Sequence, residues 1–269
     1  MGRFATLKPF SLRGYRATNR VDIMNGDEPL RVAMWSGPRN ISTAMMRAWE
    51  NRPDTFVCDE PLYAHYLHHT GLPHPVADEI IASLETDWRK VVQGLTSDVP
   101  GGKRIFYQKQ MTHHFLAHLD RAWLGRLTNC FLIRDPGEVI TSYLRILPEP
   151  TLEDLGLPQQ TEIFRWVRDH TGAVPPVLDA KDVLEDPESM LRSLCDAIGV
   201  DFTPRMLAWP PGPRSTDGIW TEHWYHNVKR STGFAPYRPK GAPVPNRFRA
   251  LHEACLEYYR ELYEYRLGQ

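Results

Sequence analysis

The sequence predicts one α/β domain with three layers, in which helices cover both faces of a central parallel sheet of about five strands. Three observations predict this fold class. Short apolar runs alternate with stretches of helical spacing, polar residues follow the end of each run, and 269 residues are enough to bury one substantial core. We expect the domain to span 29–269, with insertions that form a lid at 62–100 and a flap at 204–245.

The composition excludes several classes of protein. The 32 Lys and Arg residues nearly balance the 33 Asp and Glu residues, so a formal net charge of −1 gives no reason to expect nucleic acid or a membrane surface as a partner. No apolar run approaches the roughly 20 residues that span a bilayer. The four cysteines lie far apart without a CxxC pair, which predicts reduced core thiols and a cytoplasmic location.

The segment 1–28 precedes the first apolar run and differs from the rest of the chain in charge. Its first 20 residues contain five basic side chains and no acid, so we expect a basic arm. Two alternatives are a transit peptide and a natural start at Met24, in which case 1–23 would not belong to the natural protein.

The stretch from Arg31 to Trp49 predicts a strand, a tight loop and a helix, because an apolar run meets a Ser-Gly-Pro turn and then a segment of good helix formers. Such a loop directs backbone N–H groups and the positive end of a helix dipole at one place, where a phosphate or sulfate binds. An ordinary turn with a capping serine is the alternative. The candidate anion-binding residues are Ser36, Gly37, Pro38, Arg39, Asn40, Ile41, Ser42 and Thr43.

A second strand is predicted from Thr55 to Cys58, and Asp59 and Glu60 follow it. Since ligands bind at the carboxyl edge of an open parallel sheet, we expect both acids beside the loop. One of them is expected to be a solvated turn or capping residue. The other is a candidate for the chemistry.

Tyrosines and histidines crowd the start of the lid, before an amphipathic helix predicted from about Val76 to Leu95. The histidines suggest a metal site, but Gly71, Pro73 and Pro75 interrupt them, and we find no i,i+4 histidine pair with a neighbouring carboxylate. We therefore expect an aromatic lid on the substrate side and no metal.

A third strand is predicted from Arg104 to Lys109, and His113 and His114 follow it. A histidine at this edge can act as a base or donate a hydrogen bond to an oxyanion, whereas the alternative is a buried, satisfied imidazole. We expect one histidine of each kind.

The fourth strand, from Thr128 to Ile133, is the most strand-like run of the chain and follows a helix predicted for 120–127. Arg134 comes next, and a helix predicted from Pro136 to Ile146 carries Ser142 two turns along. Arg134 and Ser142 can therefore converge on one ligand, which makes them a second anion-binding candidate.

The remaining segments complete the predicted fold. They are a surface connection at 148–158, a helix at 159–171, a fifth strand at 176–179, a helix at 186–198, the flap and a closing helix at 244–266. The flap is rich in Trp, His, Arg, Pro and Gly without clear periodicity, which is typical of a functional loop in a compact domain.

The loop and the second candidate together resemble the sulfotransferase family that uses 3′-phosphoadenosine 5′-phosphosulfate (PAPS). In that family a strand, loop and helix with a basic residue followed by Ser or Thr holds the 5′-phosphosulfate, and Arg39 stands where many members have lysine. An arginine at a strand end and a serine on the next helix bind the 3′-phosphate, which Arg134 and Ser142 match in type and spacing. The resemblance extends from Arg31 to Val200 and departs at Ile41, where glycine is common.

The flap carries a weaker similarity to the same family. One segment of the flap resembles the late basic loop that closes over the nucleotide in that family. Its candidate nucleotide-binding residues are Lys229, Arg230, Ser231, Thr232 and Gly233.

The resemblance implies a P-loop-type fold, PAPS as co-substrate with PAP as product, no metal, and transfer of a sulfuryl group to a hydroxyl or amine of a small-molecule acceptor. A general base must take the acceptor's proton. Glu60 is similar to the glutamate of one family branch, whereas Lys109 with His113 or His114 is similar to the lysine and histidine of another. We favour Glu60, because its position relative to the loop matches better.

Two other functions compete with sulfuryl transfer. The first is a P-loop kinase or NTPase, because Phe131 to Asp135 resembles a Walker B strand whose aspartate would hold Mg²⁺. However, Ser42-Thr43-Ala44 stands where a Gly-Lys-Ser/Thr ending would be required. The second is a nucleotide-binding module without catalysis.

Overall fold

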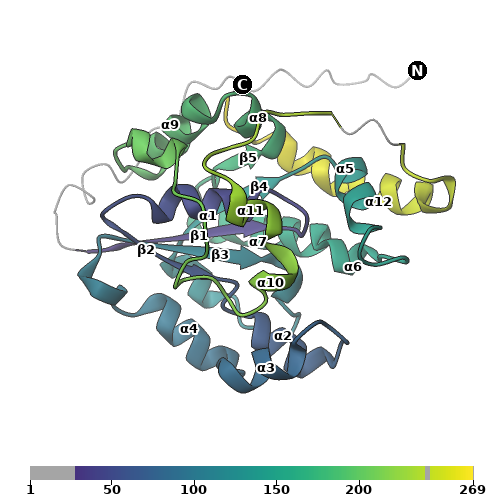
Figure 1. Cartoon of the computed structure of the whole chain (residues 1–269), viewed down its shortest axis with the longest axis horizontal. Helices are drawn as coiled ribbons and strands as arrows, with labels where there is room; N and C mark the ends of the chain where they lie inside the picture. The colour runs from purple at the N-terminus through teal and green to yellow at the C-terminus, as the bar shows by residue number, and fades with distance from the viewer. Residues whose placement is uncertain (1–27, 240–242, 269) are drawn as a thin grey trace, which may run out of the picture.

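The computed structural model describes residues 28–239 and 243–268, so the basic arm expected for 1–28 lies outside the described residues except for Glu28. The predicted α/β class is confirmed, because five parallel strands form one sheet in the order β2-β3-β1-β4-β5 (Figure 1). The strands are β1 (Leu30–Ser36), β2 (Thr55–Asp59), β3 (Ile105–Met111), β4 (Thr128–Ile133) and β5 (Val177–Asp179).

Helices fill the connections between the strands. Within the described residues the α-helices are α1 (Ser42–Glu50), α2 (Tyr63–Thr70), α3 (Ala77–Ser83), α4 (Trp88–Thr96), α5 (Pro136–Tyr143), α6 (Leu152–Leu155), α7 (Leu157–Thr171), α8 (Ala180–Glu185), α9 (Pro187–Ile198), α10 (Thr221–Trp224), α11 (His226–Arg230) and α12 (Arg249–Tyr263). Short 3₁₀ helices are η1 (Pro100–Gly102), η2 (Thr112–His114), η3 (Ala122–Arg126), η4 (Pro204–Leu207) and η5 (Asn246–Phe248).

The three layers follow from the alternation of side chains along the strands. Val32 and Met34 of β1 belong to a core that also contains side chains of α1 and α9. Ala33 and Trp35 belong to a second core with side chains of α4, α7 and α12. In Figure 1, α9 lies above the sheet and α4 lies below it. Burial on both faces explains why these strands are continuous apolar runs rather than alternating ones.

The single helix predicted from Val76 to Leu95 is wrong, because the structure has two helices, α3 and α4, in its place. Leu84 leaves α3 in an extended conformation, and Asp87 starts α4 by accepting a hydrogen bond from the N–H of Arg89 at 2.9 Å. The aspartate is therefore an N-cap that interrupts the helical periodicity.

The surface connection predicted for 148–158 is also wrong in part. It contains α6, which begins with a capping box between Thr151 and Asp154, and Leu155 at its end is buried. The short helix α8 was not predicted and begins at Asp179, which accepts a hydrogen bond from the N–H of Lys181 at 2.7 Å.

Other boundaries differ less. The helix predicted for 120–127 is the 3₁₀ helix η3, the helix after Arg134 ends at Tyr143 rather than Ile146, and the closing helix spans Arg249–Tyr263. Within the described residues no helix is long and apolar enough to cross a membrane. Cys130, Cys195 and Cys255 are free and buried, and Cys58 is free and half-buried, as predicted for core thiols.

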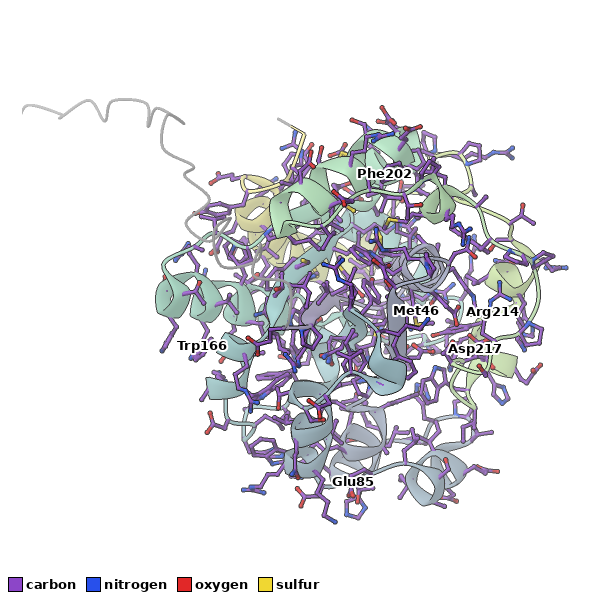
Figure 2. All side chains as sticks on the ribbon, turned by 90° about the vertical axis from the view of Figure 1, so that its left-hand side faces the viewer. Met46, Glu85, Trp166, Phe202, Arg214 and Asp217 are labelled. Carbon is purple, nitrogen blue, oxygen red and sulfur yellow. The ribbon has the colours of Figure 1, made fainter. Side chains whose placement is uncertain are left out.

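A buried ion pair attaches the flap (204–245) to α1. Arg47 donates to Asp217 at 2.8 Å and to Glu50 at 3.0 Å, and only 1% of the Arg47 side chain and 4% of the Asp217 side chain are exposed. Figure 2 shows Asp217 next to Arg214 on the side where Met46 of α1 lies, and the N–H of Arg214 donates to Asp217 at 2.8 Å. The middle of the flap is therefore held against the first helix.

We expect Arg47→Met to lower the free energy of unfolding by about 3–5 kcal/mol, because Asp217 would remain buried without its cation. Urea denaturation measures this loss. The control is Arg192→Met, which breaks an exposed pair with Glu188 and should change stability by no more than about 1 kcal/mol. Equal stability of Arg47→Met and wild type would show that this ion pair does not hold the flap.

Candidate active site

The carboxyl ends of the strands bring the predicted site residues to one edge of the sheet. The parallel register places Ser36 beside Met111 and Leu132, and Asp59 beside Lys109. The chain order reverses at β1, whose neighbours are β3 and β4. The loop after β1 therefore lies at the topological switch point, where ligands bind in open α/β sheets.

The loop between β1 and α1 is held by neighbours on both sides. A Cβ on Gly37 would come within 2.6 Å of the Leu155 carbonyl oxygen, so only glycine fits beside α6. Asn40 donates to the Leu132 carbonyl at 2.9 Å and accepts from the N–H of Ile41 at 2.8 Å. Of the other predicted loop residues, Ser36, Pro38 and Ser42 are buried and Thr43 is half-buried.

The backbone of Ile41 needs no glycine, since its φ is −91°. The left-handed conformation falls instead on Arg39, whose φ is +56°. No side chain caps α1, so the first N–H groups of this helix are available to an anion.

The two predicted anion-binding groups are joined directly. Arg39 Nε donates to Ser142 Oγ at 3.0 Å, and Arg134 Nη1 donates to the Arg39 carbonyl at 2.7 Å. Burial lowers the pKa of Arg39, and the cations of Arg134 and Arg145 lower it further. These three cations therefore favour an anion at this place.

Arg134 also has a carboxylate partner that the sequence did not reveal. Its Nε and Nη2 donate to Glu138 at 3.0 and 2.6 Å, and the Tyr237 hydroxyl donates to the same glutamate at 2.8 Å. A cavity of about 270 Å³ opens here, lined by Arg134, Glu138 and Tyr237 together with Asp179 and other residues.

A second polar cluster forms around the buried ammonium of Lys109. Its Nζ donates to Asp59 at 2.8 Å, to Glu60 at 2.6 Å and to the Tyr225 hydroxyl at 2.5 Å. Tyr225 in turn donates to Asp59 at 2.7 Å. We call Asp59, Glu60, Lys109 and Tyr225 the lysine cluster.

The charges of the lysine cluster change its proton affinities. Burial raises the pKa of Glu60; Lys109 opposes this, and Asp59 adds to it. Burial alone would lower the pKa of Lys109, but the two carboxylates raise it well above its usual value. Glu60 also has a φ of +46°, a strained conformation that is typical of functional sites.

The histidines predicted for this edge are packed among aromatic rings. His114 is buried between the rings of Tyr63 and Tyr66, with centroids 4.6 and 4.7 Å away. Burial lowers the pKa of His113 to about 3 and that of His114 well below its usual value, and nearby histidines and Lys109 lower both further. Both imidazoles are therefore neutral, and their lowered pKa makes them weak bases.

The hydrogen bonds and ion pairs of the late basic loop, in the described part of the chain, connect it to other residues of the flap. Lys229 pairs with Glu222, and Ser231 accepts from Trp209 Nε1 at 3.0 Å. Arg230 contacts Asn227, the Thr232 carbonyl accepts from the N–H of Trp209, and Gly233 pairs with Ala208, so these contacts lie within the flap. Its nucleotide-binding role stays a prediction.

The sequence predicted no i,i+4 histidine pair with a neighbouring carboxylate, and the i,i+4 pair that α2 does carry, His65 and His69, contacts a third histidine, His118. His65 Nε2 lies 3.0 Å from His118 Nε2, and the rings of His69 and His118 are 4.2 Å apart. Among the residues that the structure describes, however, no three His, Cys, Asp or Glu residues are placed to hold a metal ion.

Two curated relatives match most of this chain. The chain is 36% identical over 236 residues to branched-chain-amino-acid aminotransferase-like protein 1 of Arabidopsis thaliana, and 35% identical over 231 residues to the second protein of that name. These matches cover 88% and 86% of the chain but 41% of each relative. The chain therefore spans about two fifths of the length of these curated relatives.

One similar solved structure is a sulfotransferase from Alicyclobacillus acidocaldarius, with a TM-score of 0.52, 11% identity, and coverage of 87% of this chain and 96% of that one. At this identity the likeness concerns the fold. The model of the sulfotransferase domain family matches residues 30–264, which include the whole sheet, the loop and the lysine cluster. The chain belongs to the sulfotransferase domain family.

Proposed function

We propose that this domain transfers a sulfuryl group from PAPS to a hydroxyl or amine of a small-molecule acceptor by in-line displacement. The observation that carries the proposal is the junction of the two anion-binding groups, in which Arg39 bonds to Ser142 and Arg134 bonds to Arg39. A donor with phosphates at both its 5′ and 3′ positions suits two such groups side by side.

The part of the site that would hold PAPS consists of hydrogen-bond donors, and the loop after β1 contributes no carboxylate to it. The uncapped start of α1 and the Arg39 guanidinium can hold phosphosulfate oxygens, and Arg134 and Ser142 can hold the 3′-phosphate if Glu138 yields part of its contact with Arg134. PAPS supplies the activated sulfuryl group. Fixed positive groups at this place stabilise the charge that develops on the departing phosphate.

Glu60 is the base that we propose. The acceptor oxygen or nitrogen forms a bond to sulfur while the bond from sulfur to the 5′-phosphate oxygen breaks, and the acceptor's proton passes to the Glu60 carboxylate. Burial raises the pKa of Glu60, which brings a carboxylate closer to the proton affinity that a base needs near neutral pH. His113 and His114 are then contacts of the acceptor or the sulfuryl oxygens.

Two alternatives have less support. In the kinase alternative Asp135 would hold Mg²⁺, but its carboxylate accepts from the N–H of Glu138 at 3.0 Å as the N-cap of α5. The aminotransferase-like name of the relatives suggests amino-group transfer, which uses an uncharged lysine amine for a Schiff base. Lys109 is protonated between two carboxylates, so it does not suit that role.

The setting of the reaction is part of the same proposal. The free, mostly buried cysteines suit a reducing compartment, so we propose a cytoplasmic enzyme.

Incubation with PAPS or ATP, with and without a chelator, tests the function. Formation of 3′,5′-ADP from PAPS and a hydroxyl or amine acceptor in the presence of chelator supports the proposal. Mg²⁺-dependent ATP consumption supports a kinase, and binding without turnover supports a non-catalytic module.

Glu60→Gln should lower kcat by about 10²–10⁴-fold, because the acceptor's proton loses its base. Binding of 3′,5′-ADP, measured by calorimetry, should stay within about twofold of wild type, because none of the donor residues changes. The comparison variant is His114→Ala. An active Glu60→Gln protein beside an inactive His114→Ala protein would assign the base to the histidine instead.

Arg134→Ala should weaken the binding of 3′,5′-ADP by about 10–100-fold, because a hydrogen bond to a charged group is lost. The affinity for 5′-AMP, which has no 3′-phosphate, should fall less, because it loses only the support that Arg134 gives to the Arg39 carbonyl. Calorimetric titration of both nucleotides measures the difference, with Arg192→Ala on the exposed face of α9 as the control. An equal loss for the two nucleotides would place the 3′-phosphate elsewhere.

A further inference from the structure

We propose that Tyr225 of the flap is a positioning residue that acts through Lys109 on Glu60, so that the flap completes the site for proton removal. The proposal rests on the sulfuryl transfer proposed above. It concerns a residue that lies 166 positions from Asp59 in the sequence and bonds to it in the structure.

The hydroxyl of Tyr225 is the third acceptor of the Lys109 ammonium. An ammonium group has three N–H donors, and those of Lys109 go to Asp59, Glu60 and Tyr225. The same hydroxyl donates its own hydrogen to Asp59. With all three donors used, the orientation of the ammonium group is fixed.

No bulk water is available to replace these bonds. Lys109 is 1% exposed and Tyr225 is 4% exposed, and the ammonium lies 5.0 Å from the centre of the tyrosine ring. Burial raises the pKa of Tyr225 well above its usual value, and Asp59 adds to this. The phenol therefore stays neutral and can accept from Lys109 while it donates to Asp59.

Tyr225 separates the roles of the two carboxylates. Asp59 accepts from both Lys109 and Tyr225, and its side chain is 1% exposed. Glu60 accepts from Lys109 and its side chain is 12% exposed. Asp59 is thus the structural counter-ion of Lys109, and Glu60 is the carboxylate that an acceptor can reach.

The flap delivers Tyr225 at the junction of α10 and α11. The N–H of Tyr225 donates to the Thr221 carbonyl at 2.9 Å, and the Tyr225 carbonyl accepts from the N–H of Lys229 at 2.8 Å. A few residues earlier, Asp217 is paired with Arg47 of α1. The backbone on both sides of Tyr225 is therefore fixed.

Removal of the hydroxyl has a defined effect on Glu60. In Tyr225→Phe one N–H of Lys109 loses its acceptor, and Asp59 loses a donor. Asp59, without the hydroxyl that partly compensated its charge, then attracts the ammonium more strongly than Glu60 does. Because the cation of Lys109 lowers the pKa of Glu60, a weaker contact raises that pKa further.

The kinetic test is the pH profile of Tyr225→Phe. A base must be ionised, so activity falls as the pH drops through the pKa of Glu60, and a higher pKa moves this acid limb of kcat/KM to higher pH. We expect that shift together with a fall in kcat of about tenfold or more, and an unchanged KM for PAPS. Tyr265→Phe is the control, because it removes a hydroxyl that accepts from Arg168 at 3.3 Å outside the lysine cluster.

A readout without turnover separates this proposal from the proposed function. NMR titration of ¹³C-labelled Glu60 should show a higher pKa in Tyr225→Phe than in wild type, with or without any sulfotransferase activity. Asp59→Asn should shift the same signal to lower pH, because it removes a charge that raises the pKa of Glu60 and frees Lys109 for it. The Asp59→Asn variant also tests the effect of the lysine cluster on the pKa of Glu60 if Tyr225→Phe fails to fold.

The outcomes are distinct. A wild type without turnover but with these two opposite NMR shifts would reject the proposed function and support the role of Tyr225. Unchanged titration of Glu60 in both variants would overturn that role. A Tyr225→Phe protein that is less stable, with an acid limb and a Glu60 titration like those of wild type, would show that the tyrosine only holds the flap.

Discussion

The ammonium group of Lys109 is buried at the carboxyl edge of the sheet. The acidic half of the site is organised by the hydrogen-bond acceptors that this buried charge requires. An isolated charge in this position would cost several kcal/mol. Asp59 at the end of β2, Glu60 after it and Tyr225 from the flap meet that requirement together. One cation thus holds together two neighbouring strands and a segment from the far end of the chain.

Among the described residues three non-glycine positions have positive φ: Val76 in the lid, and Arg39 and Glu60, to which we assign the chemistry. Arg39 and Glu60 both have positive φ, at a cost on the order of 1–3 kcal/mol each. Each of these two residues is held by a bond to its own backbone. The Arg39 carbonyl accepts from Arg134, and the N–H of Glu60 donates to the Lys109 carbonyl at 3.0 Å. The side chains to which we assign binding and proton removal therefore project from backbone that is hydrogen-bonded to residues of neighbouring strands and their ends.

The site has a cationic side and an acidic side along the same edge. Arg39, Arg134 and the start of α1 lie after β1 and β4, and the carboxylates of the lysine cluster lie at the end of β2 and directly after it. Such a separation suits group transfer from an anionic donor to an acceptor that loses a proton. The two sides lie apart because β1 is flanked by β3 and β4. The chain leaves β1 toward β2 at one end of the sheet and leaves β3 toward β4 on the other side of β1.

The sequence by itself determined the succession of strands and helices along the chain and the loop after the first strand, and it predicted the pair of Arg134 and Ser142. These signals are local: periodicity, turn residues and a spacing of eight positions. The same local periodicity wrongly predicted one helix in place of α3 and α4, because it does not reveal that Asp87 is the N-cap of α4. Only the tertiary structure decided that Tyr225 joins the lysine cluster and that His114 is a neutral ring between two tyrosines. Contacts between residues far apart in the sequence, and the burial that alters their proton affinities, exist only once the chain has folded.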